Sequence, residues 1–69
     1  MKGGIRVNGD RRPLEDADLG ALMSRLGYGS DKKGVAAALN GEVVPREEWF
    51  DRALVEGDSI EIVEAVQGG

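Results

Sequence analysis

Apolar and polar positions alternate at the start of the chain and predict a short strand. Ile5-Arg6-Val7 has the two-residue period of a strand with one buried face. Asn8-Gly9-Asp10 follows, and these residue types tolerate the positive φ angles of a hairpin turn. We therefore expect the strand to pair with about residues 12–14. Because Pro13 cannot donate to a ladder, this second strand should lie at the edge of a sheet.

The next run of apolar residues predicts a helix. The spacing i, i+3, i+4, i+7 of one buried helical face is met by Leu19, Leu22, Met23 and Leu26. Asp16 and Asp18 precede this run, where a carboxylate caps the free N–H groups of a helix and complements its dipole. Gly27 stands where a C-terminal cap is expected. Both aspartates are therefore interpreted as caps and not as catalytic acids.

The middle of the chain predicts a second hairpin. Val35-Ala36-Ala37-Ala38-Leu39 has the alanine content of a helix, but it is short and is bounded by Gly34 and by Asn40-Gly41. Val43-Val44 follows that turn. We therefore interpret both segments as strands. The small alanine side chains suit a strand that the helix approaches closely.

A short helical turn is predicted over about residues 47–50, beginning at Pro45 or Arg46. Its aromatic residues, Trp49 and Phe50, are expected to pack beneath the edge of the sheet, because each can bury a large apolar area.

The last strand follows the turn residues Gly57-Asp58. Ile60 and Ile62 alternate with polar residues and account for its buried face, which leaves Val63 pointing outward. If the helix crosses one face of the sheet, the first and last strands lie side by side in parallel. This order predicts an α+β fold of the ubiquitin-like β-grasp type. It comprises a mixed sheet of about five strands, one main helix packed across it, and a short helical turn.

The length of 69 residues allows one small domain. We assign residues 1–65 to the β-grasp domain and residues 66–69 to a flexible C-terminal tail. No internal repeat or linker indicates a second domain.

The chain contains no histidine and no cysteine. The commonest general base, the commonest metal ligand and the thiol nucleophile are therefore missing. We expect no catalytic residue, no metal site and no cofactor bound by the chain itself. The composition disfavours an enzyme.

The formal net charge is -4, and the nine lysines and arginines are scattered along the sequence. This distribution disfavours nucleic-acid binding and favours an acidic face that meets a basic partner. The opening residues lead into no apolar signal region, and no apolar run approaches the roughly 20 residues that span a bilayer. We expect no membrane association and a cytoplasmic location.

The final residues Gly68-Gly69 are the best candidate for function. Glycine has no side chain, so such a tail can enter a narrow slot in another protein. With Val66 and Gln67, the extended tail would reach roughly 13 Å at about 3.3 Å per residue. Val63 is the candidate docking residue beside it. The alternative is that the glycines are an incidental flexible end.

Three features together resemble the ThiS family of sulfur carriers in thiamine biosynthesis, and the resemblance covers essentially the whole chain. They are the segment Val44-Pro45-Arg46-Glu47-Glu48-Trp49, the pair Gly57-Asp58, and the terminal Gly68-Gly69. The resemblance implies a β-grasp carrier without catalytic activity of its own. It also implies that Gly69 is the reacting residue and that Val66, Gln67 and Gly68 enter the partner's active site.

The resemblance further implies the partners. A ThiF-like enzyme would use ATP and magnesium to adenylate the Gly69 carboxylate, and a persulfide sulfur from a donor such as a cysteine desulfurase would yield a thiocarboxylate. Thiazole synthase, a ThiG-like enzyme, would then take the sulfur. Alternatives are a carrier for molybdopterin, cysteine or another sulfur metabolite, a ubiquitin-like protein modifier, and a β-grasp binding module with an incidental tail.

Overall fold

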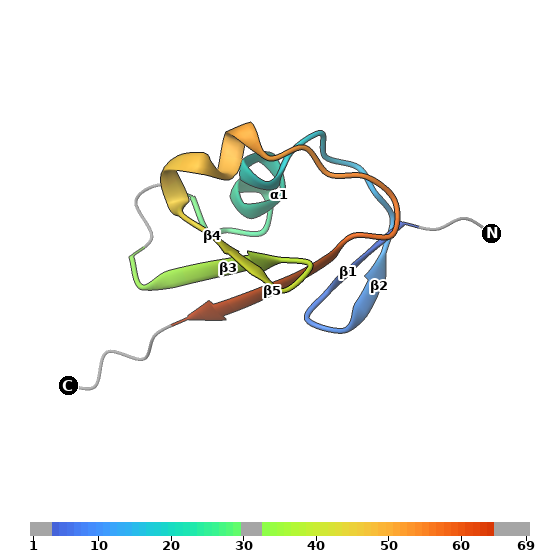
Figure 1. Ribbon diagram of the computed structural model, residues 1–69, viewed down its shortest axis with the longest axis horizontal. Helices are drawn as coiled ribbons and strands as arrows, with labels where there is room; N and C mark the ends of the chain where they lie inside the picture. The colour runs from blue at the N-terminus through green and yellow to red at the C-terminus, as the bar shows by residue number, and fades with distance from the viewer. Residues whose placement is uncertain (1–3, 30–32, 65–69) are drawn as a thin grey trace.

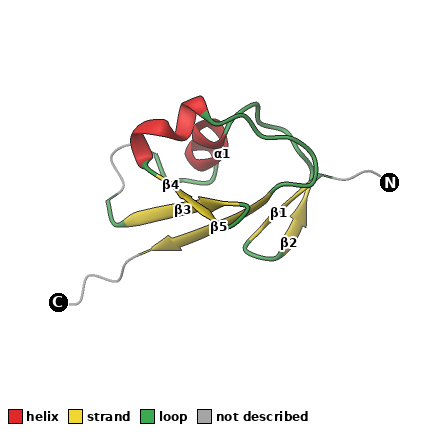
Figure 2. Cartoon of the chain, viewed as in Figure 1, coloured by secondary structure: helices red, strands yellow, loops and turns green. Residues whose placement is uncertain are grey.

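The computed structural model describes residues 4–29 and 33–64, which form a five-stranded sheet with two helices on one side (Figures 1 and 2). The strands are β1 (Ile5–Val7), β2 (Asp10–Arg12), β3 (Val35–Leu39), β4 (Glu42–Val44) and β5 (Ser59–Glu64). The helices are α1 (Leu19–Arg25) and the 3₁₀ helix η1 (Arg46–Asp51). The strand order is β2-β1-β5-β3-β4. β1 and β5 pair in parallel and the other neighbours are antiparallel, so the predicted β-grasp fold is confirmed.

The first hairpin differs from its predicted register. Asn8 and Gly9 have φ angles of 52° and 88°, as a two-residue type I′ turn requires. Asp10 therefore belongs to the second strand, and the expected pairing with residues 12–14 is wrong by two residues. Pro13 follows β2 instead of lying within it. The position of β2 at the edge of the sheet is confirmed.

Helix α1 begins and ends where the sequence predicts, but only one aspartate caps it. The backbone N–H of Ala21 donates to Oδ1 of Asp18 over 2.8 Å. At the other end, Gly27 has a φ angle of 95°, and the N–H of Tyr28 donates to the carbonyl of Met23, which is a Schellman ending.

Asp16 has a different role from the predicted cap. Its carboxylate accepts hydrogen bonds from the guanidinium of Arg25, with a shortest distance of 2.8 Å from Nη2 to Oδ2. This hydrogen bonding raises the pKa of Arg25 above its ordinary value. Asp16 thus ties the segment before α1 to the last turn of the helix, because it lies too early to reach the first free N–H groups.

The core lies between the sheet and the two helices. On the predicted apolar face of α1, Leu19, Leu22 and Met23 are buried, and Leu26 is partly buried against the core. The buried apolar residues are Ile5, Val7, Leu19, Leu22, Met23, Ala37, Val44, Trp49, Leu54 and Ile60. Of the neighbouring alanines, Ala36 is exposed. The expectation that small side chains face the helix therefore fits Ala37 alone.

The two aromatic residues of η1 take opposite positions. Trp49 is buried as predicted, whereas Phe50 is 64% exposed, which contradicts the prediction. The Phe50 ring lies against the backbone of α1 at Gly20, where an added Cβ would lie 2.4 Å from Cγ of the ring. Because Gly20 has no side chain, the ring rests on the outside of the helix.

Candidate functional site

The predicted reacting tail lies outside the described residues. This applies to Gly69, to Gly68, and to Val66 and Gln67. Their roles remain predictions. The structure does describe β5, which runs to Glu64 and thus leads directly into this segment (Figure 1).

Strand β5 pairs with β3 along nearly all of its length and with β1 only at its start. Its first residues pair with β1, and residues 60–64 pair with β3 from Leu39 back to Val35. Beyond the end of β1, the side chain of Asn8 takes over, because its Oδ1 accepts a hydrogen bond of 2.7 Å from the N–H of Ile62. The strand that precedes the tail is therefore fixed in place within the sheet.

A second asparagine anchors the start of β5. Asn40 Oδ1 accepts from the N–H of Ser59 and Asn40 Nδ2 donates to Oδ1 of Asp58, both over 2.9 Å. The other carboxylate oxygen of Asp58 accepts from the N–H of Val55, also over 2.9 Å. Asp58 is 8% exposed, and these bonds satisfy it. The Gly57-Asp58 turn thus has a structural role.

The face of the sheet turned away from the helices carries an exposed apolar strip. Val63 is 63% exposed, which confirms its predicted outward position, and it pairs with Ala36 on β3. Ala38, on the same face of β3, pairs with Val43 of β4, which is 69% exposed. We call this surface, comprising Val63, Ala36, Ala38 and Val43, the open-face strip.

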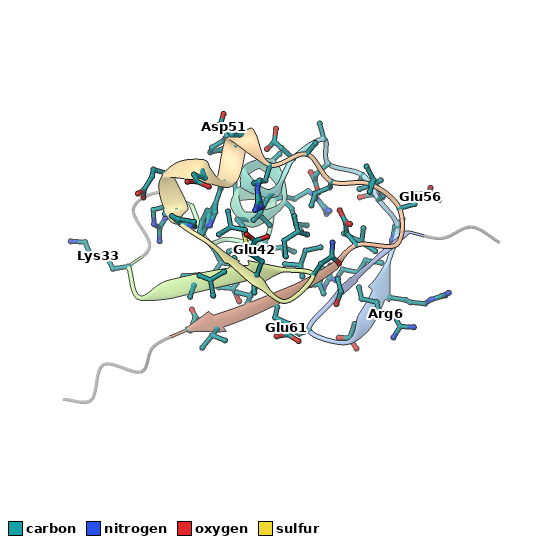
Figure 3. All side chains as sticks on the ribbon, in the orientation of Figure 1. Arg6, Lys33, Glu42, Asp51, Glu56 and Glu61 are labelled. Atoms are coloured by element: carbon teal, nitrogen blue, oxygen red, sulfur yellow. The ribbon has the colours of Figure 1, made fainter. Side chains whose placement is uncertain are left out.

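The sequence analysis predicts the outward position of Val63 but not that of Val43. Val43 is the missed residue, and the signal was available: in the pair Val43-Val44 after a two-residue turn, one valine must face the core and the other must face outward. Val44 is buried. Glu61 lies on the same outer face as Val63, and Figure 3 shows it directed away from the helices.

The signature segment at residues 44–49 forms a local structural unit. The indole Nε1–H of Trp49 donates to the carbonyl of Val44 over 2.9 Å. The guanidinium of Arg46 lies over the Trp49 ring, 4.6 Å from its centroid, and donates to the carbonyl of Gly29. The helix η1 begins at Arg46, one of the two predicted starting residues, and Pro45 is its N-cap residue. These contacts join β4, η1 and the end of the α1 segment.

Within residues 4–29 and 33–64, no group of three or more Asp, Glu, His or Cys side chains could hold a metal ion. Over the same ranges, no helix is long and apolar enough to cross a membrane.

The strand order and the helices on one face of the sheet define a ubiquitin-like β-grasp protein. The ThiS family model matches residues 5–69, and the chain belongs to the ThiS family. The expected family is thereby confirmed.

Relatives agree with this membership. The chain is 41% identical over 65 residues to the sulfur carrier protein ThiS of Thermus thermophilus, covering 94% of this chain and 98% of that protein. It is 39% identical over 36 residues to the sulfur carrier protein ThiS of Escherichia coli, covering 52% and 54% of the two chains. A crystal structure of the thiamine biosynthesis protein ThiS from Geobacter metallireducens matches with a TM-score of 0.74 at 29% identity, covering 94% of this chain and 97% of that one.

Family membership also confirms the predicted class of activity. ThiS proteins are small carriers and not enzymes, in agreement with a sequence that lacks histidine and cysteine. The chemistry therefore belongs to the proteins that meet the carrier.

Proposed function

We propose that this chain carries sulfur for formation of the thiazole ring in thiamine biosynthesis, with the Gly69 carboxylate as the reacting group. The observation that carries the proposal is the ThiS family match, which extends through Gly68 and Gly69. The relative from Thermus thermophilus, similar over almost the whole of both chains, is a sulfur carrier.

The chemistry follows from the reactivity of a carboxylate. Its oxygen is a poor leaving group, so a ThiF-like partner uses ATP and magnesium to convert the Gly69 carboxylate to an acyl-adenylate and releases pyrophosphate. A persulfide sulfur, supplied by a donor such as a cysteine desulfurase, attacks the carbonyl carbon and AMP leaves. Reductive cleavage of the resulting acyl disulfide by a thiol leaves the thiocarboxylate. A ThiG-like thiazole synthase then takes the sulfur.

The described residues support the presenting role. Immobilising the tail in a slot costs about 1–2 kcal/mol per residue in backbone entropy, so contacts elsewhere must offset that loss. The open-face strip lies on the strand that leads to the tail and on its neighbours, with Val63 and Val43 exposed. We assign docking of the adenylating enzyme to this strip and place the reaction in the cytoplasm.

Reconstitution tests the proposal. The purified chain is incubated with its cognate adenylating enzyme, ATP, magnesium, a cysteine desulfurase, cysteine and a thiol reductant, and its intact mass is measured. Exchange of one oxygen for sulfur should add about 16 Da. A variant lacking Gly69 should fold normally and gain nothing. As a control, the adenylating enzyme is first shown to be active on another carrier protein. If the active enzyme adds no sulfur to the wild-type chain, the proposal is contradicted.

A further inference from the structure

Two arginines lie directly opposite each other in the first hairpin. Arg6 of β1 pairs with Arg11 of β2 in the antiparallel register. Residues paired in this way project from the same side of the sheet, and like charges directly opposite each other are destabilising. Ile5 and Val7 on either side of Arg6 are buried, so Arg6 and Arg11 belong to the face turned away from the helices.

Acidic side chains of the described residues do not neutralise this pair. The ion pairs formed within residues 4–29 and 33–64 join Arg25 to Glu15 and Asp16, and Arg52 to Glu42. Asp58, at the end of the same strand pair, directs its carboxylate oxygens to Asn40 and to the N–H of Val55. Although the chain has a net charge of -4, Arg6 and Arg11 place two positive charges opposite each other at this end of the open face.

The pair is continuous with the open-face strip. Arg6 lies beside Ser59 of β5, and Val63 is four residues further along that strand, or about 13 Å at roughly 3.3 Å per residue. Glu61 lies between them on the same face and forms no ion pair with a residue that the structure describes. A protein interface of ordinary size, about 800 Å² on each partner, covers such a span.

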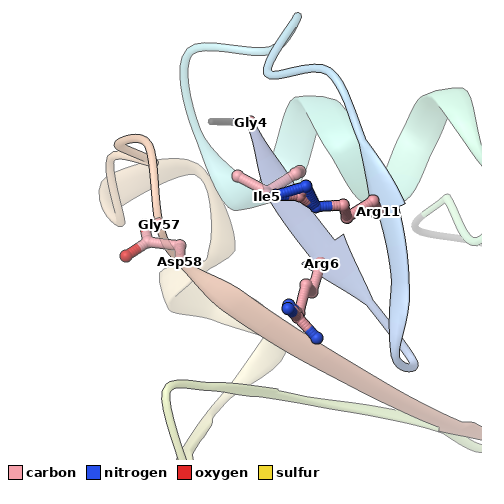
Figure 4. Close-up of a pocket in the computed structure, with 6 residues that line it drawn as sticks. All are labelled: Gly4, Ile5, Arg6, Arg11, Gly57 and Asp58. Carbon is pink, nitrogen blue, oxygen red and sulfur yellow. The ribbon is translucent and has the colours of Figure 1, made fainter. Parts of the chain in front are cut away.

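A shallow hollow beside the arginines gives a partner side chain room to approach them. Its volume is about 100 Å³, and it is lined by Gly4, Ile5, Arg6, Arg11, Gly57 and Asp58. Figure 4 shows Arg11 extending from β2 across β1 toward Ile5, and Arg6 pointing from β1 toward β5. Both residues are exposed, so their guanidinium groups can receive carboxylates in the forked geometry that arginine favours.

We propose that Arg6 and Arg11 form a cationic docking point that receives an acidic patch of the adenylating enzyme, next to the apolar contact at the open-face strip. This inference rests on the proposed function and specifies its partner surface. The charges accelerate encounter and fix the orientation of the carrier, whereas the valines hold the complex together. The two arginines repel each other in the free carrier. Carboxylates of the partner reduce this repulsion when the complex forms.

The test compares substitutions that each remove one positive charge, either from the outer face or from the helix-side face of the first hairpin. R6Q and R11Q are made singly and together in the full chain, and R12Q is the control. Arg12 follows Arg11 in β2 and is also exposed, but it lies on the helix side, where it lines a different hollow with Leu26 and Tyr28. Association and dissociation rates with the cognate adenylating enzyme are measured at about 50 mM and 500 mM salt, together with adenylation.

The double variant should associate about tenfold more slowly than wild type at low salt, and the difference should largely vanish at high salt. R12Q should stay within about twofold of wild type. The unfolding temperature of R11Q should be unchanged or higher, since a like-charge contact is lost. Normal adenylation of wild type, with the double variant associating as fast as R12Q, would overturn this inference alone. Failure of wild type to be adenylated would overturn the proposed function as well.

Discussion

Asn8 and Asn40 share the same residue type and turn conformation, but their side chains form different hydrogen bonds. Both have a φ angle of 52° and precede a glycine in a hairpin turn. Asn8 uses only its oxygen, as an acceptor for the N–H of Ile62. Asn40 uses both ends of its amide, accepting from Ser59 and donating to Asp58.

Substitution by aspartate should separate these two roles. N40D replaces a donor with a carboxylate oxygen that faces the carboxylate of Asp58, so it should destabilise the protein by about 2 kcal/mol. N8D keeps the acceptor and a residue type that tolerates positive φ, so it should stay within about 0.5 kcal/mol of wild type. Urea unfolding at neutral pH measures both. Equal losses would contradict the assigned role of the Asn40 amide.

Gly20 offers a second test at the level of single residues. An added Cβ would meet the Phe50 ring at 2.4 Å, so G20A should force the ring off the helix and lose about 1 kcal/mol despite the better helix propensity of alanine. In an F50A background the same change should be neutral or stabilising by up to about 1 kcal/mol. A double-mutant cycle measured by thermal unfolding gives the coupling. The same effect in both backgrounds would show that the ring does not pack there.

At the level of elements, the helix and both turns could be predicted because their signals are local. The apolar spacing of α1, Gly27 after it and the Asn-Gly turns each act within a few residues. Two features were not predicted. The number of residues in the first turn sets the hairpin register, and the contact of Phe50 with Gly20 depends on how η1 meets α1.

The register of the first hairpin affects the candidate site most, because it decides which residue lies opposite Arg6. Pairing with residues 12–14 would have placed Arg6 opposite Pro13, and the basic pair with Arg11 would not exist. The two-residue turn creates it. Scattered charges in a sequence can therefore meet on a surface through the pairing of strands.

The N-terminal cap of α1 provides a prediction at this scale. D18A removes the acceptor of the Ala21 N–H and should cost about 1 kcal/mol of stability. D16A removes a surface ion pair with Arg25, so its cost in stability should be smaller than that of D18A. Chemical denaturation of the two variants compares these roles. A greater loss for D16A would reverse the assignment of the cap.

At the scale of the whole molecule, one face of the sheet packs into the core, and the other face is exposed and is the proposed docking surface. The helices cover the first face (Figure 2), and the second carries the open-face strip and the Arg6–Arg11 pair. β5 belongs to both surfaces, because Ile60 is buried and Val63 is exposed on the same strand. β5 therefore contributes both to the core and to the proposed docking surface.

The strip can be tested with three exposed valines. V43D and V63D should each lower kcat/KM for adenylation by about tenfold or more, because a charge enters the centre of an apolar contact. Val55 is similarly exposed, at 59%, but lies in the loop before β5, so V55D should change kcat/KM by less than about twofold. Circular dichroism checks that all three variants fold. Equal activity of the three would exclude the strip as the docking surface.

The intact mass of the protein isolated directly from its native cells, grown without thiamine, reports whether Gly69 carries sulfur in the cell. We expect a species about 16 Da heavier than the unmodified chain, with the change located at Gly69 by fragmentation. A variant lacking Gly69 should yield no such species. Recovery of the chain solely as free carboxylate, or joined through Gly69 to lysines of other proteins, would contradict the assignment of this chain as a sulfur carrier.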